Sequence, residues 1–129
     1  MKKEIHVAVG IVINQGKRIL IAKRPENSHQ GGLWEFPGGK VEDNETAFDA
    51  LVREFREEVD LSISKASPFI KIKHDYSDKS VVLDVWQCEE FTGEAKGVEG
   101  QEVKWVAKTD LSNFSFPDAN QAIIKKLLS

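Results

Sequence analysis

Long apolar runs are missing from this sequence, and cysteine is nearly so. No hydrophobic stretch approaches the roughly 20 residues of a membrane-spanning helix, and the first residues lead into an alternating strand pattern without the apolar centre of a signal peptide. The single cysteine, Cys88, cannot form an intramolecular disulfide. We therefore expect a soluble, cytoplasmic protein in which Cys88 is buried in a strand.

A broad cationic surface is also missing. The formal net charge is −3, and acidic and basic residues are interspersed, which argues against binding to nucleic-acid backbones or membranes. A polyanionic small-molecule substrate would need local help from a metal ion or a few cations. The 129 residues are 40% hydrophobic, enough for one core, so we expect a single domain over 1–129. We also expect a monomer.

Strand patterns and turn signals alternate along the chain. Period-two alternation and β-branched residues predict strands over 5–13, 18–24, 69–76, 80–88 and 103–107. The first two form a hairpin, and the next two should pair beside it in a mixed sheet. An amphipathic helix is expected over 118–128, with Asp118 as its cap. Gly10, inside the first strand, indicates either a tolerated small residue or the close approach of another group.

The stretch from residue 39 to residue 61 carries a helical pattern with two distinct faces. Three glutamates share one face of this helix: Glu54, Glu57 and Glu58. An apolar stripe lies roughly 120° away and contains Phe48, Leu51, Val52, Phe55 and Val59. Carboxylates so close together repel one another, and oxygen clusters of this kind suit Mg²⁺ or Mn²⁺. Taken alone, the pattern fits equally well a solvated acidic face with ordinary ion pairs to Arg53 and Arg56.

A Pro-Gly-Gly turn comes directly before this helix. Pro37 fixes its own φ, and Gly38 and Gly39 permit conformations that are closed to other residues. A backbone carbonyl of the turn can therefore be directed at a ligand.

The spacing across residues 39 to 61 resembles the Nudix box, G-x5-E-x7-R-E-U-x-E-E-x-G-U, in which U is apolar. The matching residues are Gly39, Glu45, Arg53, Glu54, Phe55, Glu57, Glu58 and Leu61. Asp60 stands where the box has its last glycine, at a helix end that takes the left-handed conformation, which aspartate visits at some cost. Similarity to the branch of this family that hydrolyses oxidised guanine nucleoside triphosphates extends to residues 8–11, 24, 35–40, 99–101 and 116–120.

The resemblance implies an α/β (α+β) fold, an α/β/α sandwich around a central mixed sheet. It implies a Mg²⁺ site, or one for Mn²⁺, made by Glu54, Glu57, Glu58, Glu99 and the carbonyl of Gly38. It places the nucleotide at Arg24, His29, Glu35, Phe36, Pro37, Gly38 and Asn120, with the amide of Asn120 reading the purine edge.

The reaction implied is attack of water on the β-phosphorus of 8-oxo-dGTP, giving 8-oxo-dGMP and pyrophosphate and sparing DNA replication a mutagenic precursor. Either Glu54 or Glu99 takes the proton of the water. Arg53 is expected to orient the glutamates, and Glu45 to support the loop or the helix start. Lys23 and Lys40 are either phosphate neighbours or solvated side chains.

Two alternatives stay open at this point. The same chemistry could act on another nucleotide, such as CTP or a pterin triphosphate. A non-catalytic nucleotide-sensing module would keep the fold without turnover, but such a module is expected to have lost box acids, and Glu54, Glu57 and Glu58 are all present.

Overall fold

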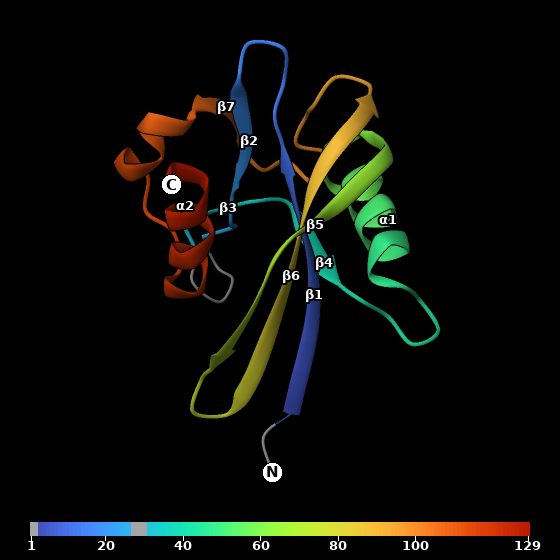
Figure 1. Ribbon diagram of the computed structural model, residues 1–129, viewed down its shortest axis with the longest axis vertical. Helices are drawn as coiled ribbons and strands as arrows, with labels where there is room; N and C mark the ends of the chain where they lie inside the picture. Colours follow the sequence, from blue (N-terminus) through green and yellow to red (C-terminus); the bar gives the residue numbers. More distant parts are fainter. Residues whose placement is uncertain (1–2, 27–30) are drawn as a thin grey trace.

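The computed structural model describes residues 3–26 and 31–129, and in this part of the chain two β-sheets combine with two α-helices (Figure 1). The strands are β1 (Lys3–Val12), β2 (Arg18–Lys23), β3 (Trp34–Glu35), β4 (Gly38–Lys40), β5 (Ser62–Asp75), β6 (Lys79–Thr92) and β7 (Val103–Ala107). The α-helices are α1 (Ala47–Val59) and α2 (Gln121–Leu128), and the 3-10 helices are η1 (Lys108–Asn113) and η2 (Asp118–Asn120).

β1 organises the larger sheet, whose strand order is β4-β1-β6-β5. It runs parallel to β6, with Ala8 opposite Asp84, and antiparallel to β4, with Ala8 opposite Gly39. The predicted mixed sheet is thus confirmed. A parallel pair needs a long crossover connection, which here includes β2, α1 and β5.

The predicted first hairpin divides between two sheets. β1 and β2 are joined at the turn by the isolated bridge between Ile13 and Ile19, and β2 then pairs with β3 and β7 in the smaller sheet, ordered β3-β2-β7. The two strands are predicted correctly, but their expected place in one sheet is wrong. The strand directions diverge because β2 pairs with β7 rather than with the parallel β1–β6 pair.

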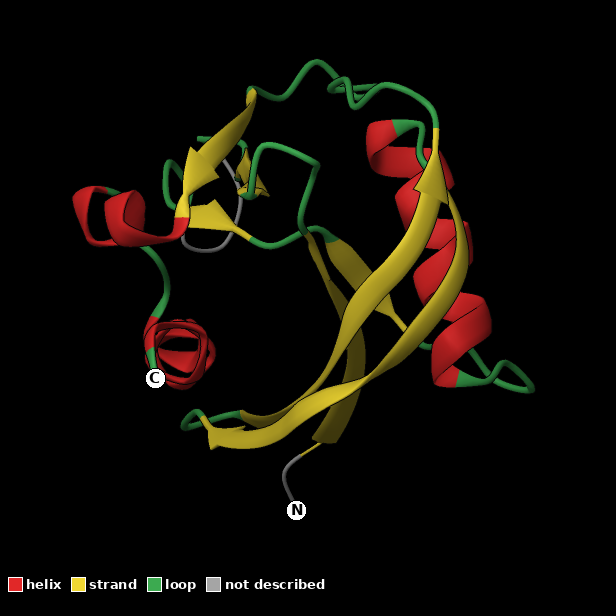
Figure 2. Ribbon diagram, turned by 45° about the horizontal axis from the view of Figure 1, so that its top comes forward, coloured by secondary structure: helices red, strands yellow, loops and turns green. Residues whose placement is uncertain are grey.

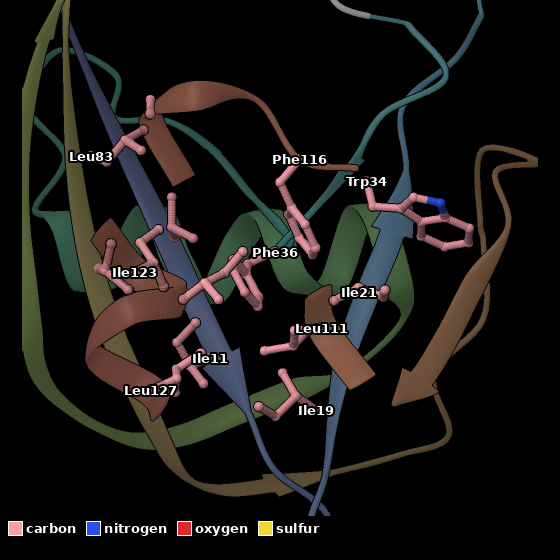
Figure 3. Packing of buried hydrophobic residues seen from close by; sticks show 14 of the residues in the cluster. Ile11, Ile19, Ile21, Trp34, Phe36, Leu83, Leu111, Phe116, Ile123 and Leu127 are labelled. Carbon is pink, nitrogen blue, oxygen red and sulfur yellow. The ribbon is translucent and has the colours of Figure 1, made fainter. Parts of the chain in front are cut away.

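Helices cover the larger sheet on opposite sides (Figure 2). Successive strand residues point to opposite faces: Ala8 and Val12 of β1 pack in the cluster that contains α1, whereas Val9 and Ile11 pack in the cluster that contains α2. This arrangement confirms the α/β/α sandwich. Figure 3 shows the second cluster, in which Phe36 and Phe116 lie among Ile11, Ile123 and Leu127.

α1 forms where its pattern predicts. The hydroxyl of Thr46 caps it by accepting a hydrogen bond from the amide of Asp49 at 3.0 Å, and Leu51, Phe55 and Val59 are fully buried. The helix ends at Asp60, which has φ 59° and ψ 36°, the left-handed conformation expected at the position of the missing glycine.

Gly10 lies where another group closely approaches the backbone of β1, which was one of its two predicted roles. A Cβ atom on Gly10 would lie 2.5 Å from Cε1 of Phe55. β1 therefore tolerates the aromatic ring of α1 directly over its backbone because residue 10 has no side chain.

Other boundaries differ from the sequence predictions. β5 and β6 are longer than expected, each covering 14 residues. The short strands β3 and β4 were not predicted, and β4 includes both glycines of the predicted Pro-Gly-Gly turn. The last helix begins with the 3-10 turn η2, which is preceded by Pro117 and has no side-chain capping bond, so the predicted cap at Asp118 is wrong. Cys88 is buried in β6 as expected, and burial raises the pKa of its thiol to about 12. No helix among the described residues is long and apolar enough to cross a membrane.

Candidate active site

The glycine turn brings β4 against both β1 and α1. A Cβ atom on Gly38 would lie 2.0 Å from the carbonyl oxygen of Ala8, and one on Gly39 would lie 2.2 Å from Cδ of Glu54. Neither glycine has a positive φ, so close packing, rather than the special backbone angles expected from sequence, requires glycine here. The amide of Gly38 donates a hydrogen bond to Oε2 of Glu58 at 3.1 Å. Glu54 and Glu58 thus lie beside the turn.

Arg53 connects the loop before α1 to the acidic face of the helix. Its Nε and Nη2 donate to the two carboxylate oxygens of Glu45 at 2.8 and 3.0 Å, and its Nη1 donates to Oε1 of Glu54 at 2.7 Å. Nη2 also donates to the carbonyl of Lys40 at 3.0 Å. The hydrogen bonds from Arg53 lower the pKa of Glu45 to about 2, and those to Glu45 and Glu54 raise the pKa of Arg53. This planar fork fixes the direction of the Glu54 side chain.

The glutamates of α1 differ in their surroundings. Burial, together with the nearby charges of Glu35 and Glu54, raises the pKa of Glu58 to about 8. Burial likewise raises the pKa of Glu54, against the opposing effect of Arg53. Glu57 is more open, with 56% of its side chain exposed and Oε1 lying 3.6 Å from Nη1 of Arg53. Negative charge held out of water in this way favours a nearby cation.

The C-terminal end of α1 is covered by the loop from residue 93 to residue 102. The amides of Lys96 and Val98 donate to the carbonyls of Val59 and Glu58, each at 3.0 Å. The loop then makes a turn, closed by a bond from the amide of Gly100 to the carbonyl of Gly97 at 3.0 Å, with φ 84° at Gly100. Glu99 lies in this turn, and its charge contributes to the raised pKa values of Glu35, Glu54 and Glu58. The turn therefore brings Glu99 to the acidic face of α1.

These carboxylates share one region without forming a closed ligand cage. Within residues 3–26 and 31–129, no group of three or more His, Cys, Asp or Glu side chains converges as a ready metal site. Instead, Arg53 holds Glu54 and the amide of Gly38 holds Glu58. The donors still fit a divalent cation, since they are hard oxygen ligands whose negative charge is partly withdrawn from water.

Two adjoining cavities open beside this acidic face. The first, of about 310 Å³, is lined by Glu58, Glu99, Gly100 and Gln101, and by Lys23. The second, of about 410 Å³, has mostly apolar walls and is lined by Ile5, Val7, Val9, Phe36, Gly38, Gly39, Lys40, Tyr76, Lys79, Val81, Leu83, Pro117, Ala119 and Asn120. Both are lined by Arg24, Pro25, Glu35 and Glu58. A single ligand can therefore reach from the acidic face to the apolar cavity.

The wall shared by the two cavities contains an ion pair. Nη1 of Arg24 lies 2.6 Å from Oε1 of Glu35. Burial nevertheless outweighs this arginine and raises the pKa of Glu35. The ion pair of Arg24 and Glu35 thus lies between the acidic and the apolar cavity.

The predicted nucleotide residues are found in different settings. Asn120 lines the apolar cavity, and its side chain makes no capping bond to α2. Phe36 lines the same cavity but is only 3% exposed and stacks on Phe116, with ring centroids 5.2 Å apart. The carbonyl of Pro37 accepts a hydrogen bond from the amide of Gly10 at 3.0 Å. His29 lies outside the described residues.

Among the polar residues that line the apolar cavity, sequence reasoning missed Tyr76 and Lys79. Tyr76 and Lys79 flank the turn between β5 and β6, and Nζ of Lys79 lies 5.9 Å from the centroid of the Tyr76 ring. An aromatic residue and a cation around a predicted hairpin turn are the signal that could have drawn attention to them. Without the tertiary structure, nothing places that turn near Asn120.

A glycine turn followed by an acidic helix, within an α/β/α sandwich of this topology, is characteristic of a Nudix domain. The chain belongs to that family, since the model of the NUDIX domain matches residues 8–126. Among individual proteins, the chain is similar to the 8-oxo-dGTP diphosphatase of Escherichia coli (strain K12), with 38% identity over 125 residues, 97% of each chain. It is 32% identical to the CTP pyrophosphohydrolase of the same organism, over 98% of this chain and 93% of that one. A solved structure from a study of MutT of Aliivibrio salmonicida and Vibrio cholerae has a TM-score of 0.85 and 38% identity, covering 98% of both chains.

Proposed function

We propose that this protein is a divalent-metal-dependent pyrophosphohydrolase that converts 8-oxo-dGTP to 8-oxo-dGMP and pyrophosphate. The observation that carries the proposal is the cleft made by the two adjoining cavities, which share Arg24 and Glu58 and reach from Glu99 to Asn120. Its acidic end suits phosphates that arrive with cations, and its apolar end suits a purine. Similarity to proteins named 8-oxo-dGTP diphosphatase supports the same substrate. The cell would thereby keep the oxidised nucleotide out of its DNA.

Glu54, Glu57, Glu58, Glu99 and the carbonyl of Gly38 would hold Mg²⁺, or Mn²⁺ in its place. When bound, such an ion neutralises phosphate charge and lowers the pKa of a water molecule. The partly buried carboxylates fit this role, because the pKa values of Glu54 and Glu58 are raised where no cation compensates them.

We assign proton transfer to Glu54. A general base must stay within hydrogen-bond reach of the attacking water, and Glu54 is the better fixed of the two candidates, because Arg53 donates to it at 2.7 Å and only 17% of its side chain is exposed. Glu99 lies in an exposed turn. Water attacks the β-phosphorus, Glu54 accepts its proton, and the bond to the nucleoside monophosphate breaks.

Asn120 supplies the base discrimination. Guanine presents an acceptor at N7, whereas 8-oxoguanine carries a hydrogen there. The side-chain oxygen of Asn120 would accept that hydrogen but would oppose the lone pair of an unoxidised N7. A pocket with such a polar contact strongly rejects a base that leaves the polar group unpaired. An apolar pocket discriminates far less between bases that differ only in size. The cavity walls around Asn120 are mostly apolar, which suits the flat faces of a purine.

The deciding experiment measures pyrophosphate release from 8-oxo-dGTP, dGTP and CTP at sub-saturating concentration with Mg²⁺. We expect the highest kcat/KM with 8-oxo-dGTP. CTP is the second candidate substrate because a CTP pyrophosphohydrolase is 32% identical to this chain. Equal rates on the three nucleotides would reject the specificity, and no release from any of them would reject the enzyme activity.

A pair of asparagine variants tests the base pocket. Asn120→Ala should raise KM for 8-oxo-dGTP at least about tenfold while leaving activation by Mg²⁺ unchanged, in line with the 1–3 kcal/mol cost of an unpaired buried polar group. Asn113→Ala, at the exposed end of η1, is the matched control. A loss of metal activation equal to the loss of nucleotide affinity would contradict the assignment.

A further inference from the structure

Gln101 joins two parts of the acidic site through one side chain. Its Nε2 donates a hydrogen bond to the carbonyl oxygen of Glu58 at 2.9 Å, at the end of α1. Its Oε1 accepts a hydrogen bond from the backbone amide of Glu99, also at 2.9 Å. Glu58 and Glu99 both line the first cavity. The Gln101 amide thus bridges the backbones of two residues whose carboxylates share that cavity.

The bridge needs a primary amide. The carbonyl of Glu58 belongs to the last helical turn, where carbonyl groups have no partner within the helix. It accepts one hydrogen bond from the amide of Val98, and its second lone pair accepts the bond from Gln101. The amide of Glu99 requires an acceptor. A glutamine side chain provides both a donor and an acceptor, whereas a carboxylate of the same shape provides acceptors alone and would direct an oxygen at the carbonyl of Glu58.

The backbone hydrogen bonds from this loop to α1 end before the turn. The amides of Lys96 and Val98 fasten the loop to the last carbonyls of α1, and a Cβ on Gly97 would lie 1.8 Å from the carbonyl oxygen of Gln101, so the chain folds back tightly on itself. The bond to Gln101 fastens the turn beyond Val98, where Glu99 lies. Both Val98 and Glu99 are exposed to solvent, and packing contributes little to holding this turn.

We infer that Gln101 is a positioning residue that holds Glu99 opposite Glu58, so that both carboxylates reach one divalent cation. The inference rests on the proposed metal-dependent function. It also makes a prediction of opposite sign to simple electrostatics. Gln101→Glu adds a negative charge beside the acidic cluster, which by charge alone would tighten cation binding. The same substitution breaks the hydrogen bond to the carbonyl of Glu58, so we expect it to weaken cation binding.

The test measures Mn²⁺ binding to the metal-free protein by the electron paramagnetic resonance signal of the free ion, without substrate. Gln101→Glu should bind Mn²⁺ at least about tenfold more weakly than wild type, the usual size of an effect from a residue that orients a ligand. Gln87→Glu, the same change at an exposed position of β6, should stay within about twofold. In the Glu99→Gln background, Gln101→Glu should lose less than about twofold, because its action passes through Glu99.

Hydrolysis gives a second measurement. The Mg²⁺ concentration for half-activation should rise in Gln101→Glu by about the same factor as the Mn²⁺ dissociation constant, while kcat at saturating Mg²⁺ stays near the wild-type value. If Gln101→Glu does not give the wild-type far-ultraviolet circular dichroism spectrum, Gln101→Met replaces it, because methionine removes both hydrogen bonds without adding charge.

The possible results separate the two proposals. Mn²⁺ affinity that is unchanged or tighter in the folded Gln101 variant would overturn the positioning role, as would an equal loss in the Glu99→Gln background. Either result would leave wild-type hydrolysis as the test of the proposed function. A wild-type protein that binds Mn²⁺ but releases no pyrophosphate would reject the proposed function, while a weakened Gln101 variant would still support the inference.

Discussion

Replacing Gly10 with alanine tests the close contact between β1 and α1. The new methyl group would lie 2.5 and 2.6 Å from Cε1 and Cζ of Phe55, and 3.0 Å from Cδ1 of Leu51. Carbon atoms in packed cores prefer separations of about 3.5–4.0 Å, so the Phe55 ring must move by about 1 Å. Phe55 is fully buried, and overpacking of such a site costs about 1–3 kcal/mol.

Urea unfolding measures this cost. With a denaturant slope of about 2 kcal/mol per molar, the unfolding midpoint of Gly10→Ala should fall by about 0.5–1.5 M. Gly16→Ala is the matched control, because the atom nearest to its added methyl group is Oδ1 of Asn14 at 3.4 Å. Its midpoint should stay close to wild type, since surface substitutions usually change stability by less than about 0.5 kcal/mol.

A second substitution identifies Phe55 as the obstacle. Phe55→Leu removes ring atoms from the region that the new methyl group of Gly10→Ala would enter. The double variant should therefore be more stable than the sum of the two single losses predicts, by about 1 kcal/mol or more. A wild-type midpoint for Gly10→Ala, or additive losses in the double variant, would refute the reasoning.

Three further predictions concern charge and the helix end. The pKa of Glu58 is raised to about 8 from an ordinary 4.5, so between these pH values the Glu58 carboxyl is protonated in the native state but not in the unfolded state, and the metal-free protein should lose thermal stability as pH rises from 4.5 to 8. In EDTA, Glu58→Gln should flatten the dependence of the melting temperature on pH over this range. A dependence as steep as that of wild type would contradict the raised pKa. The pKa of Glu45 is lowered to about 2, so the contribution of Glu45 to stability is present above pH 4.5 and lost as pH falls toward 2. Glu45→Gln should remove this part of the acid dependence of stability and, by releasing Arg53, lower kcat at least about tenfold in steady-state assays. An unchanged kcat would contradict the role of Arg53 in fixing Glu54. Asp60→Gly should raise the urea midpoint by the equivalent of about 0.5–1 kcal/mol, because glycine adopts φ 59° without strain; a lower midpoint would show that the ion pair from Lys96 to Asp60, 3.5 Å long, outweighs the strain.

The local features of this protein follow from its sequence. The apolar stripe that contains Leu51, Phe55 and Val59 predicts α1 and its buried face, because helical periodicity is a property of neighbouring residues. The spacing of the box predicts that the glutamates share a second face of the helix, and it predicts the left-handed conformation of Asp60. Strands β1, β2 and β7 begin and end within two residues of their predicted limits, since alternation and turn residues are equally local signals.

Tertiary structure decided which of these pieces meet. The parallel pairing of β1 with β6 joins residues about 75 positions apart, such as Ala8 and Asp84, and no local pattern specifies a partner at that distance. The same contacts divide the first hairpin between two sheets and bring Tyr76 and Lys79 to the cavity of Asn120. They also set the Gln101 amide between Glu58 and Glu99. The sequence by itself determined the chemical groups and the helix that carries three of them, whereas long-range packing determined their common cleft.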